Sequence, residues 1–556
     1  MDWNWPKIEP YFQDLQTRSL EKRDLHNWMS DWSKLSLLIH ESYARFQVGT
    51  TCNTTDKKLE ERFNIFLENV YPMCDAADQQ LKLKLLKSGL NPENFDVPLR
   101  QIRSESEFFR EKNLPLFTQE KKLTSEYNKI IGAQTVKWDG LEVTITRLEP
   151  VSLDSDRAQR EKAWRLASDR QLQDREKLND LWIRFLNLRE EIAKNADYSD
   201  YISYRWEYLS RFDYTPRNCK EFHASIEEVV VPAAKRILEK RKKQLGYTTL
   251  RPWDLNVDPL NHPSLKPFNT ANELTSRSAA VFHKVNPKLG AYFDSMISDK
   301  VLDLENRKGK APGGYCTTFA STGTPFIFMN SVGLQRDVRT MLHEAGHAFH
   351  AFEKLKLPYY KQHDVGAEFN EVASMAMELL ASPYLTKEDG GFYSRTEAAR
   401  ARIQHLEGIV LFWPYMAVVD AFQHWGYENP KAALDAAKCD TTWNRLWDRF
   451  MPVTDWSGLE DAKVTGWHRK LHIFNYPFYY VEYGLAQLGA VQVWRNALKN
   501  QPRAVVDYCK ALALGGTASL PKLYEAVGAR FAFDSATLKE GISLLESEMK
   551  ELEAQA

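Results

Sequence analysis

Helical periodicity extends over most of this 556-residue sequence, and it constrains the fold more than any other feature. Up to about residue 130, apolar residues recur at three- and four-residue steps, as in the segment 57–71. The same spacing runs from 155 to 250 and from 337 to the end of the sequence. These stretches predict a mainly α fold, built as a large multi-helix body.

Two segments interrupt the helical pattern. Residues 135–145 alternate on both sides of Asp139-Gly140, a dipeptide typical of a two-residue β-hairpin turn. Proline and glycine accumulate between 251 and 330, and the glycine-rich residues 308–315 predict a loop. The apolar run 325–330 that follows has the length and composition of a strand. We therefore expect a hairpin and a small sheet beside the next helix.

Charge and composition exclude several classes of partner. The 74 Lys and Arg residues nearly balance the 75 Asp and Glu residues, so nothing attracts nucleic acid or an anionic membrane. No apolar run is long enough to span a bilayer, and the sequence after Met1 lacks the features of a secretory signal. The six cysteines are scattered without a CxxC pair, as is typical of reduced thiols. We expect a cytoplasmic protein without nucleic-acid or membrane partners.

A candidate metal site lies in the last helical stretch. His343, Glu344 and His347 form an HExxH pattern, and residues four apart share one face of a helix, so both histidines can bind one ion. Glu344 lies beside them, where it can act as general base on a metal-bound water. His350 suits either the core or a supporting position. An isolated HExxH also arises by chance in exposed helices, so the prediction depends on a third ligand.

Glu371 is the best candidate for that third ligand. Glu371, Ser374 and Glu378 follow a spacing that places them on one helical face, and their neighbours are apolar, so we expect burial. A buried carboxylate requires a partner, and zinc suits Glu371. Glu378 can orient a metal-bound imidazole, although a solvated helix face explains it equally well. Glu368 is the alternative ligand, but it lacks aligned companions.

With these motifs, the sequence resembles the thimet oligopeptidase and oligoendopeptidase F family of zinc peptidases, in particular the oligoendopeptidase F and Pz-peptidase branch. The family's HExxH with a downstream Glu-x-x-Ser matches residues 343–347 and 371–374. The likeness covers nearly the whole chain and includes Leu250-Arg251-Pro252-Trp253-Asp254, Arg211-Phe212-Asp213-Tyr214 and the Pro-Gly-Gly-Tyr loop before the apolar strand. The resemblance implies a helical body that encloses a deep substrate channel.

The resemblance also implies roles for an aromatic segment near the C-terminus. In this family a histidine and tyrosines, which correspond to His472, Tyr476, Tyr480 and Tyr483, face the substrate. A phenol or imidazole aimed at the oxyanion stabilises charge that appears only in the transition state, and Tyr483 is the best candidate. The spacing from His472 to Tyr476 is one residue shorter than in the thimet branch, which weakens the match at His472.

The peptide itself is expected at the loop and strand ahead of the metal-binding helix. We assign substrate binding to Gly314, Tyr315 and Phe328, together with Tyr476. An extended peptide would pair with the edge of the strand 326–330, so main-chain hydrogen bonds would hold any sequence. Broad sequence preference follows.

The sequence thus predicts a zinc metalloendopeptidase that hydrolyses internal bonds of short unfolded peptides. One zinc ion per chain is held by His343, His347 and Glu371, and Glu344 is the general base. The site lies in a helical catalytic region, 151–556, which follows an N-terminal helical region, 1–150. Two alternatives stay open: a related carboxypeptidase or dipeptidyl peptidase that anchors a free terminus, and a peptide-binding protein without turnover. The natural peptide and the oligomeric state are not encoded in these motifs.

Overall fold

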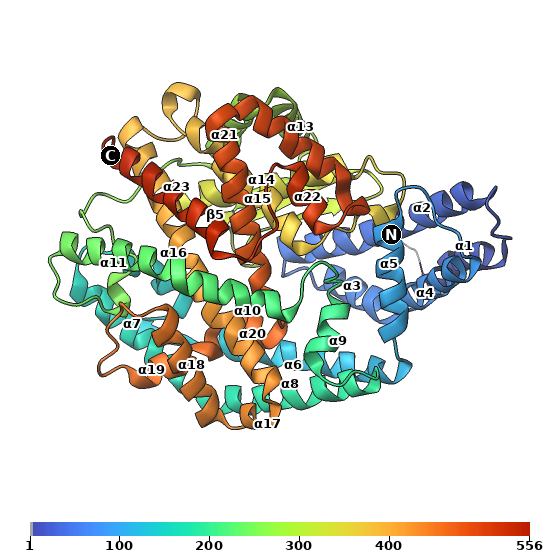
Figure 1. Cartoon of the computed structure of the whole chain (residues 1–556), viewed down its shortest axis with the longest axis horizontal. Coiled ribbons are helices and arrows are strands. Elements are labelled where there is room, and N and C mark those ends of the chain that lie inside the picture. Colours follow the sequence, from blue (N-terminus) through green and yellow to red (C-terminus); the bar gives the residue numbers. More distant parts are fainter. Residues whose placement is uncertain (1–3) are drawn as a thin grey trace.

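Helices form most of the protein (Figure 1). The computed structural model describes residues 4–556, which contain 23 α-helices and five strands. The expected mainly α fold is confirmed, because the apolar helix faces pack into one large shared core. No helix within 4–556 combines the length and the apolar character that crossing a membrane requires.

The first five helices, blue in Figure 1, form a bundle of their own. They are α1 (Trp5–Thr17), α2 (Leu25–Cys52), α3 (Lys57–Asn69), α4 (Tyr71–Ser88) and α5 (Asp96–Phe108). Their buried side chains, such as Trp28, Trp32 and Leu81, make a hydrophobic cluster apart from the main core. Tyr359, much later in the chain, belongs to the same cluster. This contact docks the bundle on the main body.

The next helices belong to the main body. They are α6 (Leu114–Gly132), α7 (Arg157–Leu172), α8 (Arg175–Asn195), α9 (Tyr201–Tyr208), α10 (Pro216–Ser225) and α11 (Val231–Leu245). Leu123 and Tyr127 of α6 lie in the main core, and the Tyr127 hydroxyl donates a hydrogen bond to the carbonyl of His468 (3.0 Å). α6 precedes residue 150, yet its side chains pack into the main core. The division of the chain into two regions at residue 150 stays a prediction.

The hairpin expected near 135–145 is confirmed. β1 (Thr135–Trp138) pairs antiparallel with β2 (Leu141–Thr144) across Asp139 and Gly140. The two turn residues have φ angles of 49° and 81°, and a type I′ turn requires positive φ at both central positions. Glycine adopts this conformation freely and aspartate tolerates it, so this dipeptide fixes the register of the hairpin.

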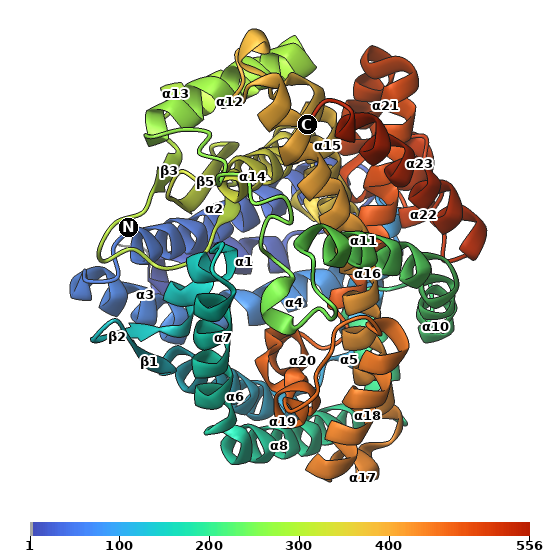
Figure 2. The ribbon, with the colours of Figure 1, turned by 90° about the vertical axis from the view of Figure 1, so that its left-hand side faces the viewer.

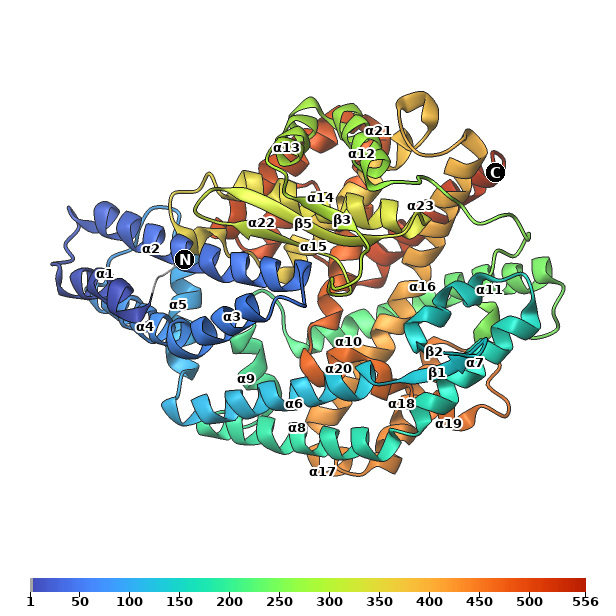
Figure 3. The same cartoon turned by 180° about the vertical axis from the view of Figure 1, so that it is seen from behind.

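A three-stranded sheet lies against α14 (Gln335–Lys354), as Figure 3 shows. Its strands are β3 (Leu302–Glu305), β4 (Tyr315–Phe319) and β5 (Thr324–Ser331), in the order β3-β5-β4. β5 confirms the expected strand, whereas β3 and β4 were not foreseen. Because β3 and β4 occupy both edges of β5, the predicted pairing of a peptide with β5 is wrong. In this three-stranded sheet, β3 and β4 each have one edge without a strand partner.

The remaining helices complete the main body, and several of them pack on α14. Two precede the sheet, α12 (Ala271–Val285) and α13 (Pro287–Ser298), and the others follow α14: α15 (Ala367–Ala381), α16 (Arg395–Glu428), α17 (Pro430–Ala433), α18 (Ala436–Phe450), α19 (Glu460–Val464), α20 (Leu471–Asn475), α21 (Tyr480–Leu514), α22 (Leu520–Ala526) and α23 (Ser535–Glu553). α15 packs against both α14 and α21. Figure 2 shows the long helix α16 running from the region of α23 towards α18.

Candidate metal centre

Asp337 fixes the start of α14. Its Oδ2 atom accepts hydrogen bonds from the N–H groups of Val332 (2.8 Å) and Leu334 (2.9 Å), which follow β5. A carboxylate in the first helical turn also suits the positive end of the helix dipole. α14 therefore begins directly after the central strand, and it holds the HExxH segment against the sheet.

Gly346, inside the HExxH segment, lets α15 approach α14 closely. A Cβ atom at this position would lie 2.6 Å from both the carbonyl oxygen of Ala373 and the Cα atom of Ser374. Both atoms belong to the backbone, so a side chain would force the two helices apart. The close packing brings Glu371 of α15 next to the two histidines of α14.

His343, His347 and Glu371 converge as metal ligands should. The Oε2 atom of Glu371 lies 3.4 Å from Nε2 of His343 and 3.8 Å from Nε2 of His347. Two nitrogen or oxygen ligands of one tetrahedral zinc lie about 3.3–3.5 Å apart, as follows from metal–ligand bonds of about 2.0–2.2 Å. The candidate ligand atoms all lie within 4.8 Å of one another. The residues present therefore fit a zinc ion with three protein ligands.

The electrostatics of these residues favour a cation. Burial lowers the pKa of His347 to about 4, so its imidazole is neutral. Burial also disfavours the charged form of His343, but hydrogen bonds to Glu371 and Glu378 outweigh it and raise its pKa well above the usual range. The two carboxylates thus create a strongly negative local potential, which attracts a divalent metal ion as it attracts a proton.

Glu378 orients His343. Its Oε1 atom lies 2.7 Å from Nδ1 of His343, which leaves Nε2 free to face Glu371. The other carboxylate oxygen lies 3.0 Å from Nε2 of His405, on α16. Burial raises the pKa of Glu378, but the hydrogen bonds to both histidines lower it far below its ordinary value. The carboxylate is therefore ionised and fixed from two sides, as in carboxylate–histidine–metal arrangements.

The neighbours of Glu371 separate it from the alternative ligand, Glu368. The Ser374 hydroxyl donates to Oε2 of Glu371 (3.1 Å), as expected from their shared helical face. Glu368 is also buried, but it accepts a hydrogen bond from the Tyr214 hydroxyl (2.6 Å) and lies 3.9 Å from Arg211. Its carboxylate is thus used elsewhere. His350 is buried against Phe369 and does not join the candidate ligands.

Glu344 lies on the metal-binding helix, and its carboxylate faces β4. It is 7% exposed, and burial raises its pKa to about 7 despite the opposing effect of His343. The main chain of Cys316, in β4, donates a hydrogen bond to its carboxylate. A carboxylate with a pKa near neutrality can both accept and release a proton, which is what a general base and acid requires.

Tyrosines from the segment before and within α21 gather near the same carboxylates. The charges of Glu371 and Glu344 both act on the hydroxyl of Tyr483, and burial is the main cause of its raised pKa. A hydrogen bond joins Tyr483 to Tyr479, whose ring lies 5.3 Å from it between centroids. His472 lies 4.8 Å from the Tyr480 ring by the same measure.

His472 and Tyr480 are mostly removed from water, whereas Tyr476 is not. Tyr480 is 7% exposed, and Lys470 lies 3.8 Å above its ring centroid. Burial lowers the pKa of His472 to about 4, so a neutral imidazole stands beside the tyrosines. Tyr476 is 49% exposed at the end of α20. The structure thus gathers all four of these predicted residues and leaves Tyr476 open to solvent.

The three residues expected to bind peptide ahead of α14 have different environments. Gly314 is exposed, and Tyr315 is half-buried, with its hydroxyl 2.6 Å from that of Thr51 in α2. Phe328 is completely buried, and its ring stacks on that of Tyr315 at 4.9 Å. The assignment of Phe328 to substrate binding is therefore wrong: both faces of the central strand are covered, and its ring supports Tyr315 from behind.

Comparison with known proteins places the chain in a family. Residues 152–541 match Peptidase family M3. The chain belongs to this family. The M3 match begins after the N-terminal bundle and covers the HExxH helix, α15 and the aromatic segment.

Sequence and structure comparisons with individual proteins support the assignment to the M3 family. An oligoendopeptidase F homolog of Borreliella burgdorferi is 23% identical over 304 residues, 54% of this chain and 50% of that protein. The chromosomal oligoendopeptidase F of Lactococcus lactis subsp. cremoris is 23% identical over 327 residues, 58% and 52% of the two chains. The chain thus spans about half the length of the curated relatives it matches. A solved structure described as Pz peptidase A with inhibitor 2 is 25% identical, with a TM-score of 0.89 and complete coverage of both chains.

Two residues of this M3 chain were missed by reasoning from the sequence. His405 approaches Glu378 from α16, and no spacing relative to HExxH indicated it. Tyr479 lies beside Tyr483, and the negative charge of Glu371 acts on its hydroxyl. Phe478 just before it has a φ of 64°, a left-handed conformation that redirects the chain into α21. That local turn is not visible in the periodicity of the segment.

Proposed function

We propose that this M3 chain is a zinc metalloendopeptidase, an oligopeptidase that hydrolyses internal bonds of short unfolded peptides. The observation that carries the proposal is the convergence of His343, His347 and Glu371 beside Glu344 and β4. Peptide substrates in a deep channel follow from the family resemblance. The partial exposure of the two histidine side chains, 23% and 24%, agrees with access from solvent. We also propose a cytoplasmic location, which suits its six unpaired cysteines.

His343, His347 and Glu371 would hold the zinc ion, with Glu378 fixing the orientation of His343. When bound there, the metal supplies Lewis acidity, which polarises the scissile carbonyl and increases the acidity of a water molecule. The three residues leave room for a further ligand, as catalytic rather than structural zinc sites do.

Glu344 moves the proton. Its buried carboxylate, with a pKa near 7, accepts a proton from the attacking water and passes it to the leaving amine. The hydrogen bond from the Cys316 main chain holds the carboxylate beside β4. This position lets one side chain serve both halves of the reaction without moving far.

Tyr483 stabilises the oxyanion that forms on the scissile carbonyl. A hydrogen bond joins the hydroxyls of Tyr479 and Tyr483, and either oxygen can donate it. When Tyr479 donates this bond, the hydroxyl proton of Tyr483 is available to the substrate. Tyr480 packs beside Tyr483, and the neutral His472 packs beside Tyr480. Tyr476, which is exposed to solvent, contacts the peptide.

The peptide backbone pairs with the outer edge of β4. β4 carries Tyr315 and Cys316, and among the described strands none occupies its outer edge. Its residues from Tyr315 to Thr318 are only partly buried, unlike the core of β5. Main-chain pairing at this edge would place an extended peptide next to Glu344 and leave side-chain choice to Gly314, Tyr315 and Tyr476.

Cleavage of a peptide with both termini blocked tests the proposal. We expect internal cleavage of an acetylated and amidated decapeptide, detected by mass spectrometry, with loss of activity on chelation and recovery with zinc. Cleavage only after one terminus is unblocked would instead support the carboxypeptidase or dipeptidyl peptidase alternative. Binding without any products, at full zinc content, would support the peptide-binding protein and contradict the proposal.

A further inference from the structure

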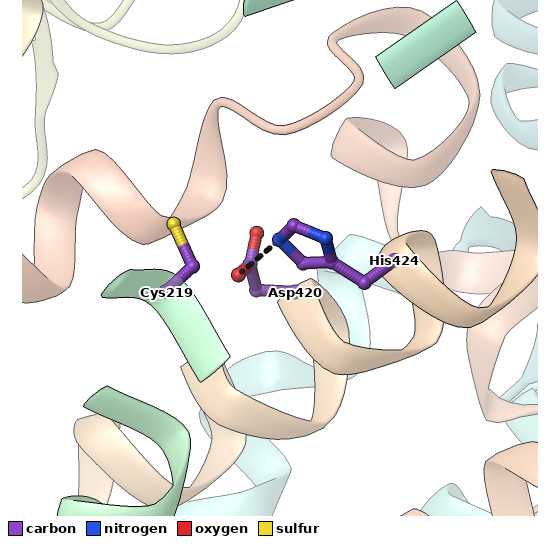
Figure 4. A group of neighbouring side chains, drawn as sticks. All are labelled: Cys219, Asp420 and His424. Atoms are coloured by element: carbon purple, nitrogen blue, oxygen red, sulfur yellow. Dashed lines mark ion pairs between the residues drawn. The ribbon is translucent and has the colours of Figure 1, made fainter. Parts of the chain in front are cut away.

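A second group of ligand-type side chains lies between α10 and α16, away from the HExxH helix (Figure 4). Cys219 and His223 are four residues apart on α10, and Asp420 and His424 are four apart on α16. Residues at this spacing share one helical face, as the two HExxH histidines do. All four are buried, at 0%, 4%, 0% and 2% exposure in that order.

Several polar atoms of this group have no hydrogen-bond partner. Nδ1 of His424 and Oδ1 of Asp420 are buried without a hydrogen-bond partner, and Nε2 of His424 has only the ion-pair contact with Oδ2 of Asp420. A buried polar atom without a partner destabilises the folded protein, so several in one place require an explanation. A bound cation would satisfy a carboxylate oxygen and an imidazole nitrogen at once.

The spacing of the atoms agrees with a shared metal ion. Nε2 of His424 lies 3.4 Å from Oδ2 of Asp420, which is long for a charge-assisted hydrogen bond and close to the edge of about 3.3–3.5 Å in a tetrahedral zinc site. The same distance separates His343 and Glu371 at the HExxH helix. The candidate atoms of Cys219, Asp420 and His424 all lie within 4.8 Å of one another.

We propose that Cys219, Asp420 and His424 form a second, structural zinc site. Figure 4 shows the Cys219 sulfur and the His424 ring on either side of the Asp420 carboxylate. His223 completes the group, because its Nε2 atom lies 2.8 Å from Oδ2 of Asp420 and fixes that carboxylate. The proposal raises the expected zinc content from one to two per chain.

The charges balance with a metal in place. A thiolate at Cys219 and the carboxylate of Asp420 together neutralise a divalent ion, so the buried centre carries no net charge. The charge of Arg211 acts on Cys219, but its guanidinium donates a hydrogen bond to Glu482 (2.5 Å) and is thereby neutralised. The charge of Arg449 acts on His223, and its guanidinium donates to Glu227 (2.8 Å), so both arginines near the site are paired with carboxylates.

A metal between α10 and α16 would hold these two helices together and so stabilise the position of α16 next to the HExxH site. α16 also carries His405, which contacts Glu378. The second site is closed to solvent, so no substrate reaches it and its role is structural; His223, the buried imidazole that contacts Asp420, can supply the fourth ligand that a structural zinc needs. The ion would enter during folding and exchange slowly.

Metal content tests the site. Full-length protein produced in zinc-supplemented medium should contain two zinc ions per chain by elemental analysis. Cys219→Ser and His424→Gln should each contain one, and so should Glu371→Ala, which removes a ligand of the other site. Cys439→Ser is the matched control, because Cys439 is equally buried but its thiol faces the carbonyl of Ala433.

Cobalt provides a readout in the parent protein itself, before any variant on α10 is made. The HExxH site contains no thiolate, so only the second site can give a thiolate-to-cobalt charge-transfer band. We expect this band in the cobalt form of the parent protein, of Glu371→Ala and of Cys439→Ser, and its absence in Cys219→Ser. A single zinc per chain that Glu371→Ala abolishes, together with no charge-transfer band in the cobalt form, would overturn the second site.

Discussion

Nδ1 of His343 lies 2.7 Å from Oε1 of Glu378, although the two residues come from different helices. This contact holds the imidazole so that Nε2 faces Glu371 and His347. His405 holds the same carboxylate from the opposite side. The ligand geometry therefore depends on three helices, α14, α15 and α16.

Glu378→Gln should weaken zinc binding at the HExxH site without removing a ligand. The amide still accepts a hydrogen bond, but it no longer supplies the negative charge that polarises His343, and losses of about 10–100-fold in metal affinity are typical. The measurement is the buffered zinc concentration that restores half the activity of metal-depleted protein. Glu546→Gln, at a carboxylate on α23 that is 35% exposed and pairs with Arg236, is the control. An unchanged zinc requirement would show that Glu378 has no such role.

Gly346→Ala should separate α14 from α15. The added methyl group would lie 2.6 Å from backbone atoms of Ala373 and Ser374, and such overpacking costs about 1–3 kcal/mol. We expect a lower melting temperature and weaker zinc binding, because Glu371 moves with α15. Gly408→Ala is the matched control: it is also within a helix, its nearest neighbour lies at 3.9 Å, and it should be neutral or stabilising. Equal melting temperatures for the two variants would contradict this account of Gly346.

Tyr483→Phe should lower kcat by about 10²–10³-fold with little change in KM, as for the loss of one oxyanion donor. Tyr479→Phe should have a smaller effect in the same direction, because it removes only the hydrogen bond that orients Tyr483. Tyr208→Phe, at a tyrosine on α9 that is 45% exposed, is the control. If kcat of Tyr483→Phe stays within a few-fold of the parent value at equal zinc content, Tyr480 and His472 become the donors to test.

Methylation of single peptide nitrogens should reveal the pairing with β4. In a strand pair, alternate residues direct their N–H groups to the partner, so methyl groups at alternate positions near the cleaved bond should raise KM. The measurement is KM for a set of peptides that differ only in the methylated position. A smooth dependence on position, without alternation, would count against edge pairing.

The parts of the site that repeat with a helical period could be predicted from the sequence. His343 and His347 share a face of α14, as do Glu371 and Ser374 of α15, and the structure brings all four together. The helix breaks and the Asp139-Gly140 turn were also predicted, because local backbone preferences determine them.

Features that depend on packing between distant segments could not be predicted. Phe328 was assigned to the substrate because it lies in the strand before the helix, but this strand is the central one of the sheet and its residues 325–329 are buried. His405 contacts Glu378 only because the fold brings this part of α16 next to α15. The left-handed backbone at Phe478 determines where Tyr479 points. None of these relationships has a periodic signature in the sequence.

The most direct test of the account is kcat of Glu344→Gln on a blocked, internally quenched decapeptide, measured together with zinc content. Glutamine keeps the size of the side chain but cannot accept the proton from water. The account predicts unchanged zinc content, a KM close to that of the parent protein and a kcat lower by at least about 10²–10⁴-fold. A kcat within a few-fold of the parent value, at the same zinc content, would contradict the assignment of Glu344 as the general base.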